Sequence, residues 1–139
     1  MAASGKITAK GRRQLLDAAR EAAMNAYAPY SGLRVGAALL TRQGRIYTGV
    51  NVENASFGLT ICAERAAVAA AVAQEGAGVR IRALAVVNAG GSPCSPCGAC
   101  RQVLQELGPD AMVLFFSSAG LEEKAVSTLL PQAFSLPRP

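Results

Sequence analysis

Apolar positions along the chain follow two spacings, one typical of amphipathic helices and one typical of buried strands. After Thr8, which can cap a helix, small and apolar side chains recur at helical spacing and predict a helix over about residues 9–28. Two strands are predicted next, over about 34–41 and 45–50. The pair Gln43-Gly44 between them is typical of a hairpin turn.

The second half of the chain alternates between helix and strand. The pattern predicts a helix near residues 62–75, a continuously apolar strand over about 82–88, a helix near 98–107 and a buried strand at 112–117. Following an N-terminal helix and a hairpin, this order predicts an α/β fold. We expect a three-layer α/β/α sandwich with a mixed, about five-stranded sheet.

Composition narrows the possible partners. The 139 residues, of which 51% are hydrophobic, fit a single domain over 1–139, and 1–8 are expected to be a flexible tail. A net charge of +5 could indicate a nucleic-acid partner, but the basic residues are scattered and aromatic residues make up only 5%. We therefore expect no nucleic-acid partner. No apolar stretch fits a signal peptide or a membrane span, so we expect a cytoplasmic protein without a membrane partner.

Three cysteines and a glutamate form the most informative pattern in a chain without histidine. Cys97 and Cys100 lie three residues apart at the start of one predicted helix, and Cys62 begins another. Both helices follow a strand-to-loop transition, so their N-termini are expected to converge at one end of the sheet. Three thiolates leave one position of a tetrahedral zinc ion open for water. Glu64, two residues after Cys62, is placed to move the protons of that water.

Other arrangements of the same residues are possible. Cys94 lies three residues before Cys97 and could pair with it, but the helix pattern that begins at Gly98 favours Cys97 with Cys100, which leaves Cys94 as a small apolar filler. A closed structural zinc site with all four cysteines leaves Glu64 unexplained. A Cys-x-x-Cys redox centre needs no third cysteine on a separate helix. Catalytic zinc is the favoured interpretation.

Two arginines each lie close in sequence to a candidate zinc ligand. Three thiolates on Zn²⁺ leave an excess negative charge, which disfavours the ionisation of a bound water. Arg65 and Arg101 are expected to hydrogen-bond the sulfurs and offset that charge.

Six segments, in order along nearly the whole chain, resemble the small, homotetrameric, three-cysteine class of cytidine deaminases. They are residues 27–31, 35–39, 49–56, 62–65, 95–102 and 129–131. The resemblance implies that Cys62, Cys97 and Cys100 hold one Zn²⁺ per chain, that Glu64 is the proton shuttle, and that Arg65 neutralises thiolate charge.

The resemblance also implies contacts with a nucleoside. Asn51 and Glu53 would hydrogen-bond the ribose, chiefly its 3′-hydroxyl. Phe57 matches a position that is commonly aromatic, and Phe134 matches one thought to reach a neighbouring subunit's pocket. Leu33 is a departure, because the family usually has there a phenylalanine that packs edge-on against the base. Its loss is worth about 0.5–1.5 kcal/mol, so we expect a moderately raised KM.

The implied reaction is the zinc-dependent hydrolytic deamination of cytidine and 2′-deoxycytidine to uridine and 2′-deoxyuridine, with release of ammonia, as a step of pyrimidine salvage. The implied assembly is a homotetramer whose pockets are shared between subunits. Two other functions compete with this one. A deaminase of the same fold could act on another aminopyrimidine, such as a nucleoside antibiotic. A zinc-stabilised binding module without catalysis would need no glutamate at position 64.

Overall fold

The computed structural model describes residues 6–138, and its regular elements follow the predicted order. Residues 1–5 of the expected tail lie outside the described residues, whereas the carbonyl of Lys6 accepts a hydrogen bond of 2.9 Å from Arg82. The elements are α1 (Ala9–Ala23), β1 (Val35–Thr41), β2 (Ile46–Val50), the short 3-10 helix η1 (Phe57–Leu59), α2 (Ala63–Glu75), β3 (Ile81–Asn88), α3 (Gly98–Leu107), β4 (Met112–Ser117), β5 (Gly120–Ala125) and α4 (Val126–Leu129).

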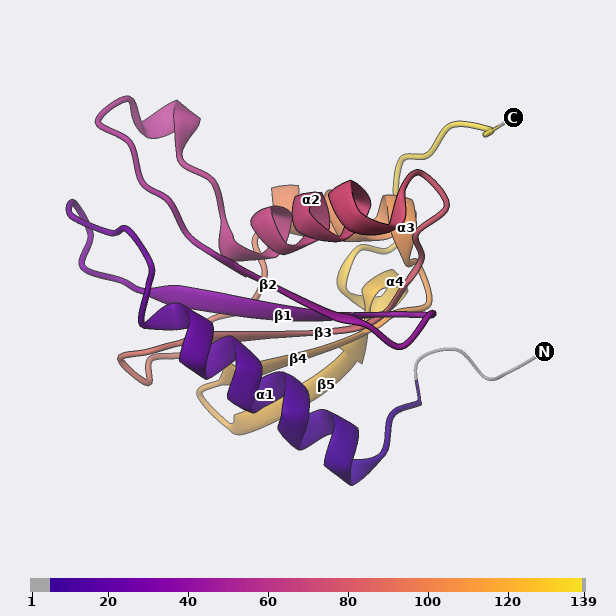
Figure 1. The fold of residues 1–139 in the computed structure, drawn as a ribbon, viewed down its shortest axis with the longest axis horizontal. Coiled ribbons are helices and arrows are strands. Elements are labelled where there is room, and N and C mark those ends of the chain that lie inside the picture. The colour runs from indigo at the N-terminus through magenta and orange to yellow at the C-terminus, as the bar shows by residue number, and fades with distance from the viewer. Residues whose placement is uncertain (1–5, 139) are drawn as a thin grey trace.

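Five strands form one mixed sheet in the order β2-β1-β3-β4-β5. The pairs β1–β2, β1–β3 and β4–β5 are antiparallel, and β3–β4 is parallel. Helix α1 covers one face of the sheet, and α2, α3 and α4 lie on the other (Figure 1). Each interface has its own apolar cluster, with Leu15 and Ala19 of α1 in one and Ala67 and Leu104 in the other. The predicted three-layer sandwich with a mixed, five-stranded sheet is confirmed.

Helix α1 begins as predicted but ends earlier. The side chain of Thr8 accepts a hydrogen bond from the backbone N–H of Gly11, 2.9 Å long, and so caps the first turn. The helix ends at Ala23 and not near residue 28. Tyr27 is extended, and its backbone bonds to Asn51 and Glu53, at 3.1 and 2.9 Å. These bonds to a distant segment compete with the helix and shorten it.

Two glycines allow the helices to approach the sheet closely. A Cβ on Gly36 of β1 would lie 2.6 Å from the backbone nitrogen of Ala23 in α1. A Cβ on Gly49 of β2 would collide with the backbone of α2 at Ala63 and Ala67. Real side chains do not come so near to a backbone, so glycine is required at both positions. The contact at Gly49 fixes the first turn of α2.

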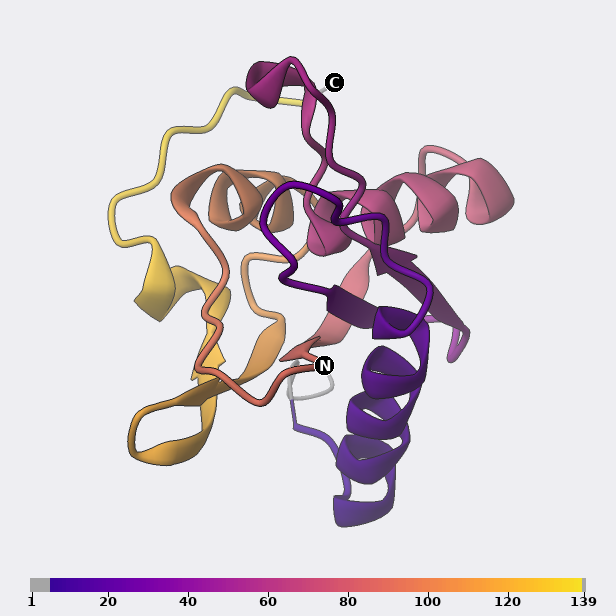
Figure 2. The same cartoon turned by 90° about the vertical axis from the view of Figure 1, so that its left-hand side faces the viewer.

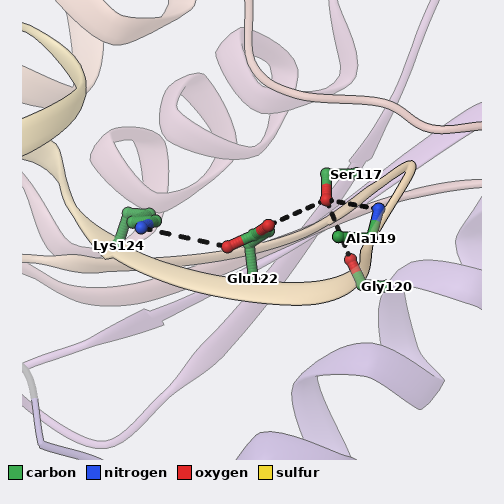
Figure 3. Close-up of polar contacts among 5 residues, drawn as sticks. All are labelled: Ser117, Ala119, Gly120, Glu122 and Lys124. Atoms are coloured by element: carbon green, nitrogen blue, oxygen red, sulfur yellow. Dashed lines mark hydrogen bonds and ion pairs between the residues drawn. The ribbon is translucent and has the colours of Figure 1, made fainter.

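The strand β5 was not among the predicted segments. It forms a hairpin with β4, and the hydroxyl of Ser117 lies 2.8 Å from a carboxylate oxygen of Glu122 and accepts a hydrogen bond from the N–H of Ala119 at 3.0 Å (Figure 3). Lys124 lies 3.9 Å from the other oxygen of Glu122. Because β5 is an edge strand with polar side chains, it lacks the apolar pattern of the buried strands.

Two long loops and the N-termini of α2 and α3 gather at one end of the sheet. The loops at 24–34 and 51–61 run side by side there and protrude together beyond the sheet, which Figure 2 shows end-on. An isolated bridge between Tyr27 and Val52 joins them. In the described part of the chain, none of the helices is both long and apolar enough to cross a membrane.

Candidate active site

Three cysteine sulfurs converge where α2 and α3 begin. Cys62 is the N-cap residue of α2, Cys97 is the N-cap residue of α3, and Cys100 lies in the first turn of α3. All three Sγ atoms lie within 4.8 Å of one another, and those of Cys97 and Cys100 are 3.6 Å apart. The predicted convergence of the two helix N-termini is confirmed, and Cys94 is not part of the cluster.

The surroundings of the cluster favour negative charge on the sulfur of Cys62. The Cys100 thiol and the Arg65 guanidinium, whose Nη2 lies 3.3 Å from the Cys62 sulfur, lower the pKa of Cys62 to about 5. The same contact with Cys62, together with burial, raises the pKa of Cys100. The partial positive charge of the helix N-termini acts in the same sense on Cys62. A divalent cation bound here would replace the shared thiol protons.

Glu64 lies in the first turn of α2 and is 5% exposed. Burial raises the pKa of its carboxyl group, with a smaller contribution from the negative charge of Cys62. The residue nevertheless lines the same cleft as Cys62 and Cys97. A carboxyl group that is largely withdrawn from water but faces a cleft is suited to proton transfer.

A cleft of about 240 Å³ opens beside the cysteines. A second hollow of about 450 Å³, between Tyr30 and Phe57, shares Ser31, Glu53 and Thr60 with it. The cleft brings together most of the sequence-predicted site residues. It is lined by Ser31, Leu33, Val35, Asn51, Glu53, Thr60, Cys62, Ala63, Glu64, Cys94, Ser95 and Cys97.

Asn51 and Glu53 both line the cleft, and neighbouring backbone holds each of them. The Asn51 amide accepts a hydrogen bond from the N–H of Val35 and donates one to the carbonyl of Leu33, both 2.8 Å long. It therefore keeps one N–H for a ligand. The carboxylate of Glu53 accepts hydrogen bonds from the N–H groups of Tyr30 and Ser31, at 2.9 and 3.1 Å.

Ser31 is a site residue for which no individual role was predicted. Its hydroxyl donates a short hydrogen bond to the second oxygen of Glu53, and this bond is the main cause of a lowered Glu53 pKa. The same hydroxyl accepts a hydrogen bond from the N–H of Leu33 at 3.0 Å. The available signal was the position of Ser31 in a turn before Gly32, where a serine often bonds to nearby backbone.

The three apolar candidates occupy different places. Leu33 lines the cleft and is 53% exposed. Phe57 lies on the protruding loop, is 74% exposed, and meets Tyr30 edge-on with ring centroids 6.0 Å apart. Phe134 is 69% exposed and is not among the residues that line the cleft of its own chain.

The expectation that Arg101 hydrogen-bonds the cysteine sulfurs was wrong. The guanidinium of Arg101 donates to the carbonyls of Pro96 and Leu129 and not to a sulfur. Its side chain turns away from the cluster because these two carbonyls lie within its reach.

Cys94 is half-buried, and its backbone N–H donates a hydrogen bond to the carbonyl of Phe116 at 2.9 Å. Burial raises the pKa of its thiol to about 11, as fits an inert side chain.

Comparison with known proteins gives one family. The family model described as "Cytidine and deoxycytidylate deaminase zinc-binding region" matches residues 9–116. A cytidine deaminase of Sporosarcina psychrophila is 46% identical over 125 residues, which cover 88% of this chain and 90% of the relative. One of Halalkalibacterium halodurans is 47% identical over 127 residues, covering 89% and 94%.

Solved structures of cytidine deaminases are also similar to this chain. The crystal structure of cytidine deaminase from Mycobacterium tuberculosis superposes with a TM-score of 0.79 at 46% identity, over 90% of this chain and 98% of that one. The structure of cytidine deaminase from Burkholderia pseudomallei gives a TM-score of 0.79 at 45% identity, over 92% and 100%. The similarity thus extends over the fold as well as over the cluster.

Proposed function

The chain belongs to the cytidine and deoxycytidylate deaminase family, and from this premise we propose that it hydrolyses cytidine and 2′-deoxycytidine to uridine and 2′-deoxyuridine with release of ammonia. One observation carries the proposal. Three cysteine sulfurs lie within 4.8 Å of one another beside a cleft that the buried Glu64 also lines.

The donor set fits one Zn²⁺ per chain. Soft thiolate ligands select zinc among the common divalent ions, and sulfurs bound to tetrahedral zinc at about 2.3 Å lie about 3.8 Å apart. The separation of 3.6 Å between the sulfurs of Cys97 and Cys100 is close to that value. In this proposal Cys62, Cys97 and Cys100 hold the ion, and Arg65 offsets the excess negative charge through its contact with Cys62.

Glu64 moves the protons in this mechanism. Zinc, when bound, supplies an activated water as the nucleophile at C4 of the cytosine. Glu64 takes a proton from that water and delivers it to N3, which makes C4 more electrophilic. It then takes the proton of the hydroxyl group that the water has left on C4 and delivers it to the departing amino group, so that ammonia leaves and the C4 carbonyl of the uracil ring forms. Burial of Glu64 excludes bulk water from this exchange.

Asn51 and Glu53 bind the sugar. The carboxylate of Glu53 is held ionised by three hydrogen-bond donors and accepts a hydrogen bond from the 3′-hydroxyl, while the remaining N–H of Asn51 donates to it. Cytidine and 2′-deoxycytidine share that hydroxyl, so both are accepted. Leu33 forms an apolar wall for the base. A free-nucleoside substrate suits pyrimidine salvage, and four free cysteines suit the reducing cytoplasm.

The exposed apolar side chains around the cleft favour a homotetramer with shared pockets. Phe57, Leu59 and Tyr30 are 74%, 66% and 53% exposed on or beside the protruding loops. Apolar surface of this kind is typical of a protein interface. In such an assembly Phe57 and Phe134 contact the cleft of a neighbouring subunit. Light scattering measures the mass, and a monomer would contradict this part of the proposal.

The test is turnover by metal-analysed protein. Wild-type protein should convert cytidine, followed by loss of the cytosine absorbance band and by ammonia release, at a rate that scales with bound zinc. Glu64→Gln should keep about one zinc per chain and lose about 10²–10⁴-fold in kcat. Glu106→Gln, a matched change on the exposed side of α3, should leave turnover unchanged. A zinc-loaded wild-type protein without turnover of either nucleoside would overturn the proposal.

A further inference from the structure

Cys97 has the least side-chain support of the three cysteines. Cys62 contacts the guanidinium of Arg65, and Cys100 is fully buried. Cys97 is exposed, and within residues 6–138 its sulfur makes its polar contacts with the other two cysteines of the cluster, at 3.6 Å with Cys100. The position of the Cys97 sulfur therefore depends on how firmly its backbone is held.

Arg101 holds the peptide groups on both sides of Cys97. Its backbone N–H donates to the carbonyl of Cys97 at 3.0 Å, and its Nε donates to the carbonyl of Pro96 at 2.7 Å. These carbonyls belong to the two planar peptide groups that flank the Cys97 Cα. Fixing both planes fixes the φ and ψ of Cys97, −69° and 171°, and leaves only the rotation of its side chain.

The other end of the Arg101 guanidinium reaches α4. Its Nη1 donates to the carbonyl of Leu129 at 2.8 Å. Leu129 is the last residue of α4, where carbonyls have no partner within the helix. Pro96 is fully buried, so the loop before Cys97 is packed as well as hydrogen-bonded. The planar guanidinium can hold two carbonyls at once, which the single ammonium of a lysine does less well.

We propose that Arg101 is a positioning residue for the metal centre: by tying the loop before Cys97 to the end of α4, it sets where the Cys97 thiolate lies relative to Cys62 and Cys100. Arg101 acts through the backbone and touches neither a sulfur nor the substrate. This inference rests on the proposed function only in that the cluster holds zinc.

The test compares Arg101→Gln and Arg101→Lys with the wild type. Arg80→Gln is the matched control, because Arg80 also donates to a backbone carbonyl, that of Val79 at 2.7 Å, but lies between α2 and β3. Three quantities are measured: the rate of zinc release to a chromophoric chelator, the absorption spectrum of the Co²⁺-substituted protein, and kcat and KM for cytidine.

We expect Arg101→Gln to release zinc about 10–100-fold faster, with a changed Co²⁺ spectrum. We expect kcat to fall with little change in KM, because the residues that hold the sugar lie on other elements. For Arg101→Lys, the zinc-release rate and kcat should lie between those of Arg101→Gln and the wild type, because one donor group remains. Arg80→Gln should leave the zinc-release rate and the spectrum at wild-type values.

Wild-type zinc release and an unchanged Co²⁺ spectrum in Arg101→Gln would overturn the inference, even if the variant melts at a lower temperature. If Arg101→Gln does not fold, Arg101→Lys is judged by the same two measurements. A wild-type protein that binds zinc but does not deaminate cytidine would refute the proposed function and leave the comparison of zinc release valid.

Discussion

Replacement of Gly49 by alanine should loosen both the fold and the metal centre. A Cβ at this position in β2 would collide with the backbone at Ala63 and Ala67 and would lie 2.9 Å from the carbonyl carbon of Ala66. Ordinary contact between carbon atoms is about 3.5–4.0 Å, so α2 would have to move away from the sheet by at least about 0.5 Å. That helix carries Cys62 at its N-cap and Glu64 in its first turn.

The expected loss of stability combines two effects of opposite sign. Overpacking against two backbone groups costs about 3 kcal/mol, at the upper end of the usual range. The lower entropy of the unfolded alanine variant offsets about 0.4–1 kcal/mol of this. The free energy of unfolding should therefore fall by about 2 kcal/mol, which lowers Tm by about 8 °C for a chain of this size. Because Cys62 and Glu64 move with the helix, kcat should fall by about tenfold or more.

Urea unfolding of the zinc-loaded protein at one fixed protein concentration measures this effect, and a cytidine assay follows kcat. Gly78→Ala is the control, because a Cβ at Gly78 meets no heavy atom within 4 Å and its φ is not in the left-handed region. It should leave stability unchanged or raise it by about 0.4–1 kcal/mol. A Gly49→Ala protein with the wild-type unfolding midpoint and wild-type kcat would refute the reasoning.

Three further predictions concern the site. Cys100→Ala removes a buried sulfur and should abolish stoichiometric zinc binding and lower Tm, whereas Cys94→Ala should keep its zinc; metal analysis showing one zinc per chain in Cys100→Ala would exclude that ligand. Leu33→Phe should lower KM for cytidine by about 2–10-fold by restoring an edge-on aromatic contact, and an unchanged KM would contradict the role of that contact. Because hydrogen bonds lower the pKa of Glu53, its ionised form and the stability it contributes persist above the ordinary carboxyl pKa and are lost as pH falls through the lowered value. Ser31→Ala removes the main cause of the lowered Glu53 pKa. As pH is lowered, KM for cytidine should therefore begin to rise at a higher pH than in the wild type; superimposable profiles of KM against pH would disprove this coupling.

Much of the fold was predictable because its signals are local. The helix α3 and the strand β4 have the predicted bounds, and β1, β2, β3 and α2 agree within one residue. Caps and periodic apolar positions act over a few residues, so they are visible in the sequence alone. The strand β5 was missed because its central residues, Glu122, Glu123 and Lys124, are all charged and carry no such pattern.

Part of the candidate site was likewise predictable from the sequence, and part was not. Ligand types and spacing were sufficient to place Cys62, Cys97 and Cys100 together, with Glu64 beside them. The helices α2 and α3 follow β2 and β3, which run in the same direction, so both helices begin at one end of the sheet. The sequence could not reveal that Arg101 turns from the sulfurs to two carbonyls.

Most of the helices and strands, and the cysteines that can bind a metal, were therefore predictable from the order of residues alone. Where α1 ends, how Ser31 holds Glu53 and what Arg101 contacts depend instead on the folded arrangement of the chain. A hydrogen bond between distant segments depends on which groups the folded chain brings within about 3 Å. Local preferences leave that choice open.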